Sequence, residues 1–179
     1  MLCLFAAEVP NPAQDRSALV RMLLRRAYDL VWDEDCPALE KTPAGKPWFP
    51  SRPERFLSLS HSRTFVLVAL SDVPVGADVE TVRPVSDHLR DRLFRPEEQA
   101  DFGFFEGWTL RESVYKLTGA GSLWTMPLSL RDGMIQTPYP GVSCRVYHDL
   151  PGCVAAVAAR ADCDALPHCV TRLSLCGGE

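Results

Sequence analysis

The chain has 179 residues, of which 46% are hydrophobic and 23% charged, and its formal net charge is −4. This is enough apolar side chain for the core of one medium domain, or of two small halves that share an interface. The negative charge argues against a general attraction to nucleic acid or to an anionic membrane, so basic residues have to be judged by their local positions.

The first two predicted elements are a strand over residues 2–9 and a helix over 14–31. The apolar start has no basic residue and is followed at once by Glu8 and two prolines, so we do not expect a secretory signal. No apolar run approaches the ~20 residues of a membrane span, and we expect a cytoplasmic protein. The helix is indicated by apolar residues at i, i+3 and i+4 spacing, namely Leu19, Met22, Leu23, Ala27 and Leu30.

Residues 33–55 contain five prolines and are predicted to form an irregular loop. Three antiparallel strands are expected next. The segment 56–62 alternates apolar and polar residues, 64–71 is a continuous apolar run typical of a strand buried on both faces, and 75–80 forms the third strand.

Helices are predicted over residues 85–94, from Pro96 onwards, and over 106–118, where Gly119 ends the last of them. Short strands are then expected at 126–131, 142–148, 153–159 and 168–175. The order of strand, helix and sheet strands occurs once before residue 72 and again after it, which suggests a weak internal repeat.

The cysteine pattern favours free thiols over a disulfide framework or a zinc site. The count is odd and no C-x-x-C pair occurs. A metal at Cys163, His168 and Cys169 is the minor alternative. The seven cysteines are Cys3, Cys36, Cys144, Cys153, Cys163, Cys169 and Cys176.

Asp78 and Glu80 are the first candidate metal ligands. Side chains at i and i+2 of a strand point to the same face, so these two carboxylates would stand side by side while Val79 faces the core. Like charges so close repel unless a cation joins them, and hard oxygen ligands suit Mg²⁺. For an isolated D-x-E the alternative of a solvated strand face is favoured.

Glu112 and Lys116 are four residues apart and share one face of the predicted helix, with Arg111 beside them. An ordinary surface ion pair is the alternative. Together with Asp78 and Glu80, however, a third carboxylate beside two cations matches what a metal–diphosphate site requires, because Lys and Arg bind phosphate oxygens.

Ser60 and His61 stand at the end of a predicted strand. A hydrolase would use Ser60 or Ser62 as nucleophile and His61 as base, but the G-x-S-x-G elbow is absent. As hydrogen-bond donors to a phosphate, Ser60 and His61 need no such geometry.

These motifs, taken in order, resemble the 4′-phosphopantetheinyl transferases of the surfactin-synthetase-activating type. The matching segments are S-L-S-H-S (58–62), V-G-A-D-V-E (75–80) and F-F-E-G-W-T-L-R-E-S-V-Y-K-L-T-G-A-G (104–121). The family signatures are a G-x-D-x-E strand and a W-x-x-K-E-x-x-x-K helix. Each motif alone is weak, whereas the ordered set is specific in spacing and residue type.

The resemblance implies an α+β fold of two similar halves, 1–71 and 72–179, each a small antiparallel sheet with a packed helix, and a monomer with pseudo-symmetric halves. It also implies transfer of phosphopantetheine from coenzyme A to a serine of an apo acyl or peptidyl carrier protein. Asp78, Glu80 and Glu112 match the Mg²⁺ ligands. Glu112 is also the proposed base, and Lys116 contacts phosphate; with Asp78 these two form the catalytic set.

The resemblance assigns the coenzyme's other contacts to five further positions. Ser60 and His61 match residues that hold its phosphates, and Lys46 matches a lysine near the nucleotide. Arg16 and Ser17 match an Arg-Thr pair near the adenosine 3′-phosphate. The rest of the expected coenzyme set is Lys116 and Arg111.

Three departures from the family pattern stand out. Arg111 replaces the usual lysine, and Ala77 replaces a larger aliphatic residue. Only Pro10–Ala13 links the first strand to the first helix, where the family inserts a basic helical segment. This shortened N-terminal half leaves open a second interpretation, a non-enzymatic binding or regulatory homologue that no longer holds coenzyme A productively. A different Mg²⁺-dependent phosphotransferase is the third, although no G-x-x-x-x-G-K-[ST] loop occurs.

Overall fold

The computed structural model describes residues 1–175, so Cys176 lies outside the described residues. It confirms the predicted α+β class. The N-terminal part contains β1 (Leu2–Glu8), α1 (Arg16–Trp32), β2 (Glu40–Lys41), β3 (Pro47–Trp48), β4 (Phe56–His61) and β5 (Phe65–Ser71). The remainder contains β6 (Val75–Thr81), α2 (Asp87–Leu93), α3 (Pro96–Asp101), α4 (Phe104–Thr118), β7 (Ser129–Arg131), β8 (Met134–Gln136), β9 (Ser143–Tyr147), β10 (Cys153–Ala159), the 3₁₀ turn η1 (Cys163–Ala165) and β11 (Thr171–Arg172).

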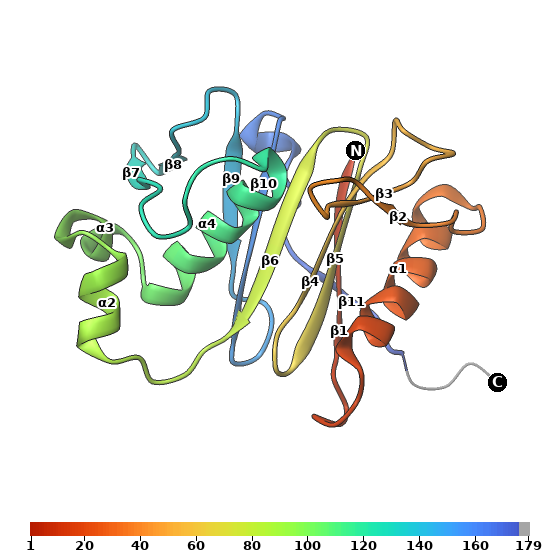
Figure 1. Cartoon of the computed structure of the whole chain (residues 1–179), viewed down its shortest axis with the longest axis horizontal. Helices are drawn as coiled ribbons and strands as arrows, with labels where there is room; N and C mark the ends of the chain where they lie inside the picture. Colours follow the sequence, from red (N-terminus) through yellow and green to blue (C-terminus); the bar gives the residue numbers. More distant parts are fainter. Residues whose placement is uncertain (176–179) are drawn as a thin grey trace.

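The first sheet has the strand order β11-β1-β5-β4, and α1 packs against one of its faces (Figure 1). The central strand β5 is buried along its whole length. Val66 and Val68 belong to the cluster beneath α1, whereas Leu67 and Ala69 belong to a core shared with the second sheet. The predicted burial of this strand on both faces is therefore confirmed.

The second sheet is antiparallel, in the order β6-β10-β9, and α4 covers one of its faces. Ala156 and Ala158 of β10 pack beneath Leu110 and Val114 of α4. The Ser113 hydroxyl donates to the Ala156 carbonyl oxygen at 3.0 Å. Short alanine side chains let α4 lie close to the strand, so the position of α4 is held by both packing and a buried hydrogen bond.

Two serine side chains join the sheets where β4 runs beside β6. The Ser58 hydroxyl oxygen accepts the Ala77 N–H at 2.9 Å, and the Ser60 hydroxyl oxygen accepts the Val79 N–H at 3.3 Å. Both serines are buried. Because these hydroxyls satisfy backbone donors that no strand pairing reaches, the polar positions of the alternating segment 56–62 connect the two sheets.

Three segments differ from their predicted structure. The loop 33–55 contains the hairpin β2–β3, which turns at Gly45 with a φ of +82°. Only residues 129–131 of the predicted strand 126–131 are extended and paired, and only 171–172 of 168–175. Apolar composition alone does not decide pairing, because a strand forms only where a neighbour supplies backbone partners.

The last described strand returns to the first sheet. Thr171 and Arg172 pair in parallel with Phe5 and Ala6 of β1. The division of the chain into halves at residues 71 and 72 stays a prediction, and this pairing joins the last described strand to the sheet that contains the first.

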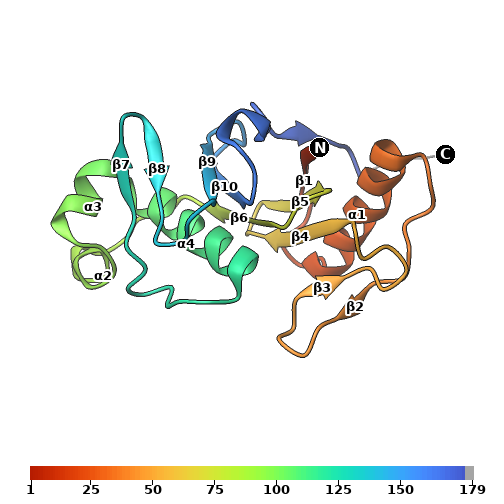
Figure 2. The same ribbon diagram turned by 90° about the horizontal axis from the view of Figure 1, so that it is seen from above.

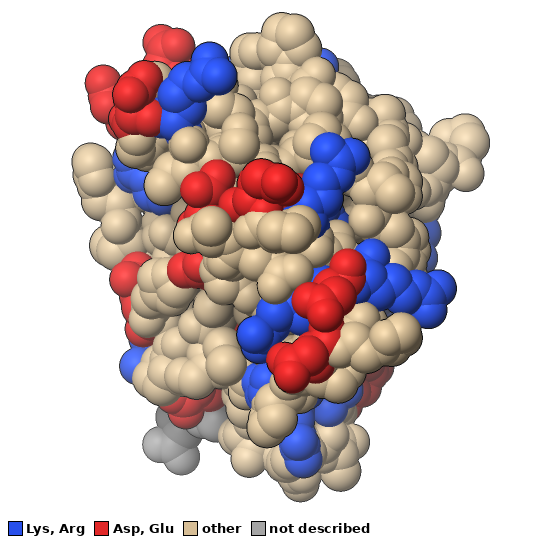
Figure 3. Space-filling view, turned by 90° about the vertical axis from the view of Figure 1, so that its left-hand side faces the viewer, with Lys and Arg blue, Asp and Glu red and all other residues tan. Residues whose placement is uncertain are grey.

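The helices α2 and α3 and the hairpin β7–β8 lie at the end of the molecule remote from α1 (Figure 2). On that face, positive and negative side chains are interspersed among uncharged ones without a broad patch of one sign (Figure 3). Within residues 1–175, no helix combines the length and the apolar character needed to cross a bilayer.

The six cysteines among the described residues are all free thiols. Cys144 and Cys153 are buried in strands β9 and β10. Burial raises the pKa of the Cys144 thiol to about 12. Such a thiol stays protonated at neutral pH and acts as a small apolar side chain.

Gly76 marks the closest approach of β6 to α4 and leads to a stability prediction. A Cβ at this position would lie 2.1 Å from the Ser113 carbonyl oxygen and 2.5 Å from the Leu117 nitrogen. Both are backbone atoms that cannot rotate away. We expect Gly76→Ala to cost about 3 kcal/mol of unfolding free energy, the upper end for overpacking, as measured by urea denaturation.

Gly103→Ala is the matched control for this measurement. There the nearest atom is the flexible Glu106 carboxylate oxygen, at 3.2 Å, and the backbone is extended. Exchange of glycine for alanine before a helix should change stability by less than about 1 kcal/mol. Equal stability of the two variants would contradict the tight β6–α4 contact.

Candidate functional site

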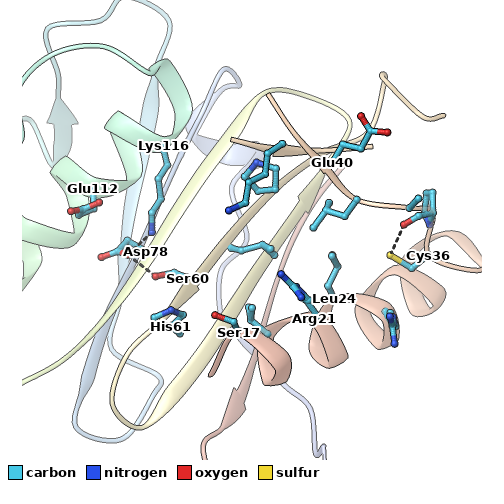
Figure 4. A pocket seen from close by; sticks show the side chains of 18 of the residues that line it. Ser17, Arg21, Leu24, Cys36, Glu40, Ser60, His61, Asp78, Glu112 and Lys116 are labelled. Atoms are coloured by element: carbon cyan, nitrogen blue, oxygen red, sulfur yellow. Dashed lines mark hydrogen bonds and ion pairs between the residues drawn. The ribbon is translucent and has the colours of Figure 1, made fainter. Parts of the chain in front are cut away.

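A cavity of about 770 Å³ opens between α1 of the first sheet and α4 of the second. Its walls come from α1, the segment 36–47, β4, β6 and α4. This volume falls within the range of small-molecule sites in proteins. Figure 4 shows the side chains that line it, with Asp78, Glu112 and Lys116 on one side and α1 on the other.

Asp78 is the most constrained acid of the cavity, with 5% of its surface exposed. Its Oδ1 accepts the Ser60 hydroxyl at 2.6 Å and the Lys116 ammonium at 2.7 Å. Its Oδ2 is buried and has no hydrogen-bond partner within residues 1–175. A buried carboxylate oxygen is costly to leave unpaired, so this atom needs a donor or a cation that the protein does not supply.

Glu80 and Glu112 also line the cavity, from β6 and α4. Burial raises the pKa of both carboxyls, and the nearby charge of Asp78 raises each further. Val79, between the two acids of β6, belongs to the shared core. The predicted alternation of β6 is therefore confirmed. Three carboxyl groups line one cavity and repel one another when ionised.

Lys116 forms its ion pair with Asp78. An ordinary surface ion pair on the helix would instead have joined it to Glu112. The Lys116 ammonium also donates to the Ala77 carbonyl oxygen at 3.2 Å. The i, i+4 spacing places Glu112 and Lys116 on one face of α4, and both line the cavity. A solvated helix face does not describe this arrangement.

Ser60, His61 and Ser17 line the same cavity. The Ser60 hydroxyl donates to Asp78, and the Ser62 hydroxyl donates to the Phe65 carbonyl oxygen. Among the described residues, neither serine is hydrogen-bonded to His61. The geometry therefore gives no support to a serine hydrolase.

The structure corrects the expected role of Arg111. Its guanidinium is 1% exposed, donates to Glu98 at 2.9 Å and to the Leu93 carbonyl oxygen at 2.6 Å, and lies over the Phe94 ring. It does not line the cavity. Arg111 follows Leu110, which packs against the sheet, so the helix turns it toward the interior beside α2 and α3 instead of toward a phosphate.

Two further expected contacts are absent from the cavity lining. The Lys46 ammonium donates to the carbonyl oxygens of Val75 and Leu117, both at 3.4 Å, and burial lowers its pKa. Arg16 donates to the Pro12 carbonyl oxygen at 3.5 Å. In this structure Lys46 therefore connects the hairpin to β6 and to the end of α4, and Arg16 braces the start of α1.

The cavity also contains three cations that the motifs did not indicate, Arg21, Arg25 and Lys41. Ser17, Arg21 and Arg25 are spaced by four residues, so the periodicity of α1 already placed them on one face. Lys41 carried no such signal, because it lies in the proline-rich segment whose hairpin the sequence did not predict.

Comparisons with known proteins show the family to which this chain belongs. A model of the 4′-phosphopantetheinyl transferase superfamily matches residues 74–152, which include β6 and α4. The 4′-phosphopantetheinyl transferase Sfp of Bacillus subtilis is 30% identical over 160 residues, which cover 79% of this chain and 70% of that protein. This chain belongs to the 4′-phosphopantetheinyl transferase superfamily.

Two other members of the superfamily show similar identity. The psf-1 transferase of Bacillus pumilus is 32% identical over 113 residues, which cover 58% of this chain and 48% of that protein. The AcpT transferase of Salmonella typhimurium is 31% identical over 133 residues, 66% of each. The chain thus spans from about half to about two thirds of the superfamily members it matches.

As they stand, no three His, Cys, Asp or Glu side chains of residues 1–175 converge closely enough to hold a metal ion. At the superfamily motif, the Lys116 ammonium occupies the position beside Asp78 Oδ1. The carboxyls nevertheless fit a hard cation, because Asp78 Oδ2 is unpaired and Glu80 and Glu112 are crowded by like charge.

Proposed function

We propose that this chain transfers the 4′-phosphopantetheine group of coenzyme A to a serine hydroxyl of an apo carrier protein, with Mg²⁺ as cofactor. The observation that carries the proposal is the buried, unpartnered oxygen of Asp78 among three carboxyls, in a cavity whose opposite wall is cationic. Family membership supplies the reaction class, and the site supports it with an arrangement suited to a metal-bound diphosphate.

Asp78, Glu80 and Glu112 would hold Mg²⁺, which supplies charge neutralisation at the pyrophosphate oxygens. Glu112 accepts the proton of the carrier serine hydroxyl, a role open to a carboxylate that lines the cavity. The serine oxygen then forms a bond to the β-phosphorus, and the bond to adenosine 3′,5′-bisphosphate breaks.

Lys116 and His61 both line the cavity and provide hydrogen-bond donors to it. Lys116, released from Asp78, binds a non-bridging phosphate oxygen and stabilises negative charge in the transition state. Ser60 keeps Asp78 in place through the 2.6 Å hydrogen bond. We also propose that the protein acts as a monomer, because one chain supplies every wall of the cavity. We propose a cytoplasmic location, because the sequence has neither a signal-like start nor an apolar run long enough for a membrane span.

Mass spectrometry of the carrier protein tests this function. We expect an apo acyl or peptidyl carrier protein, incubated with the chain, coenzyme A and Mg²⁺, to gain the mass of one phosphopantetheine group. A carrier with its acceptor serine changed to alanine should gain nothing, and a chelator should stop the reaction reversibly. Binding of coenzyme A without any mass gain would favour the non-enzymatic homologue instead.

A further inference from the structure

The hairpin β2–β3 supplies part of the cavity wall and projects away from the strands of the first sheet (Figure 2). Glu40, Lys41 and Pro47 of the hairpin line the cavity, together with residues 36–39 before it. Each strand of the hairpin has 2 residues, and the turn residues 43–45 are exposed. Because an isolated hairpin is marginally stable in water, its position depends on contacts with the rest of the protein.

The two ends of the hairpin are held in different ways. At its base, Phe49 is buried in the cluster beneath α1, and Leu39 packs against that cluster. The turn lies at the other end. Within residues 1–175, the hydrogen bonds that join the segment 36–48 to residues 72–175 all come from the Lys46 ammonium. This one side chain therefore fastens the turn of the hairpin to the elements that carry the carboxyls.

The acceptors of Lys46 form a socket made of backbone atoms. Its ammonium donates to the carbonyl oxygens of Val75 and Leu117, both at 3.4 Å. Leu117 lies in the last turn of α4, where carbonyl oxygens lack partners within the helix and the helix dipole favours a cation. The two carbonyls are close together because Gly76 lets β6 approach α4: a Cβ there would lie 2.5 Å from the Leu117 nitrogen.

We propose that Lys46 is a positioning residue, which fastens the turn of the hairpin to β6 and α4 and so holds one cavity wall in place for coenzyme A. The identity of this ligand rests on the proposed function. Lys46 does not line the cavity, so it acts through Glu40, Lys41 and Pro47 and not by touching a phosphate. A wall that is ordered in advance lowers the free-energy cost of binding, since the ligand need not order it.

Hydrogen exchange of the free protein tests the anchor without a ligand. In the turn, the Thr42 N–H donates to the Lys46 carbonyl oxygen at 2.9 Å, and the Gly45 N–H donates to the Thr42 carbonyl oxygen at 2.8 Å. We expect Lys46→Met, which keeps the length of the side chain without its ammonium, to speed exchange of these two amides at least about 5-fold. Exchange in the buried strand β5 should stay as in wild type.

Isothermal titration without carrier protein tests the effect on the ligand. We expect Lys46→Met to weaken binding of coenzyme A and of its 3′-dephospho form equally, by about 5-fold, because a wall is loosened and no phosphate contact is lost. In the transfer assay, KM for coenzyme A should rise about 5-fold while kcat stays within about 2-fold of wild type. Lys46→Arg, which keeps hydrogen-bond donors, should fall between wild type and Lys46→Met.

Gly45→Ala disturbs the same hairpin and leaves the Lys46 ammonium in place. The added Cβ meets no atom within 4 Å, but the φ of +82° strains any residue other than glycine. It should weaken binding of both ligands by about 2-fold, and adding Lys46→Met should have less than its separate effect, since both act through one element. Arg131→Met, a charge loss in β7 outside the cavity lining, is the control and should leave both affinities unchanged.

The inference is overturned if Lys46→Met leaves either the exchange of the hairpin or the affinity for coenzyme A unchanged. A loss confined to coenzyme A overturns it too, because that marks a direct contact with the 3′-phosphate, and so does a lower kcat at unchanged KM. Failure of the proposed function looks different: the wild type then neither modifies a carrier protein nor binds coenzyme A. The assignment of this ligand fails with it, whereas hydrogen exchange still decides whether Lys46 anchors the hairpin.

Discussion

Asp78→Asn should lower kcat/KM for carrier modification by at least about 1,000-fold, which corresponds to about 4 kcal/mol of transition-state stabilisation. The substitution keeps the size of the side chain and an oxygen that can accept the Ser60 hydroxyl. It removes the negative charge and can place an amide N–H₂ where the unpaired Oδ2 stands. A cation held by oxygen ligands would then lose one of its three carboxylates.

The same experiment should separate chemistry from folding. Circular dichroism and the urea midpoint of Asp78→Asn should stay close to those of wild type. The 2.6 Å contact to Ser60 is retained, and relief of the repulsion from Glu80 and Glu112 offsets the loss of the partly exposed Lys116 ion pair. Asp72→Asn is the matched control: Asp72 is exposed and pairs with the N-terminal amine, far from the cavity lining. A wild-type kcat/KM in Asp78→Asn would contradict the assignment of Asp78 as a metal ligand. An equal loss of kcat/KM in Asp72→Asn would do the same.

Arg111→Met should cost about 3–5 kcal/mol of unfolding free energy, although Arg111 does not touch the cavity. Its guanidinium and the Glu98 carboxylate form a buried pair at 2.9 Å, with 1% and 6% of their side chains exposed. Removing one partner leaves an uncompensated buried charge, which is far more costly than losing a surface pair. Met keeps the length of the side chain and its packing against Phe94.

An exposed ion pair provides the comparison for this measurement. Arg172 and Glu8 form a pair in which about half of each side chain or more is exposed. Arg172→Met should therefore cost less than about 1 kcal/mol. If both variants lost the same small amount in urea denaturation, the buried pair would not be the element that fixes α3 against α4.

The Glu98 carboxyl should also make this contribution depend on pH. Burial alone would raise its pKa, but hydrogen bonds from the backbone N–H groups of Arg95 and Leu128 and from Arg111 lower it below 4.5. A lowered folded-state pKa stabilises the protein above the unfolded value, and this stabilisation is lost as the pH falls through the folded-state pKa. The stability difference between wild type and Glu98→Gln should thus shrink below about pH 4.

The sequence by itself determined those helices and strands whose apolar and polar residues repeat at the spacing of the element. A continuous apolar run predicted β5 as a strand buried on both faces. Alternation in β6 predicted that Asp78 and Glu80 share one face while Val79 faces the core. The i, i+4 spacing predicted that Glu112 and Lys116 share one face of α4. These inferences hold because the directions of neighbouring side chains follow from backbone geometry within a few residues.

Only the tertiary structure decided which of those faces meets the cavity. Arg111 and Glu112 are adjacent on α4, yet one is enclosed beside Glu98 and Phe94 while the other lines the site. Lys46 and Lys41 flank one turn, and the hairpin directs Lys46 to backbone carbonyl oxygens and leaves Lys41 in the cavity wall. The physical reason is that the environment of a side chain depends on elements distant in sequence, which no local pattern of residues encodes.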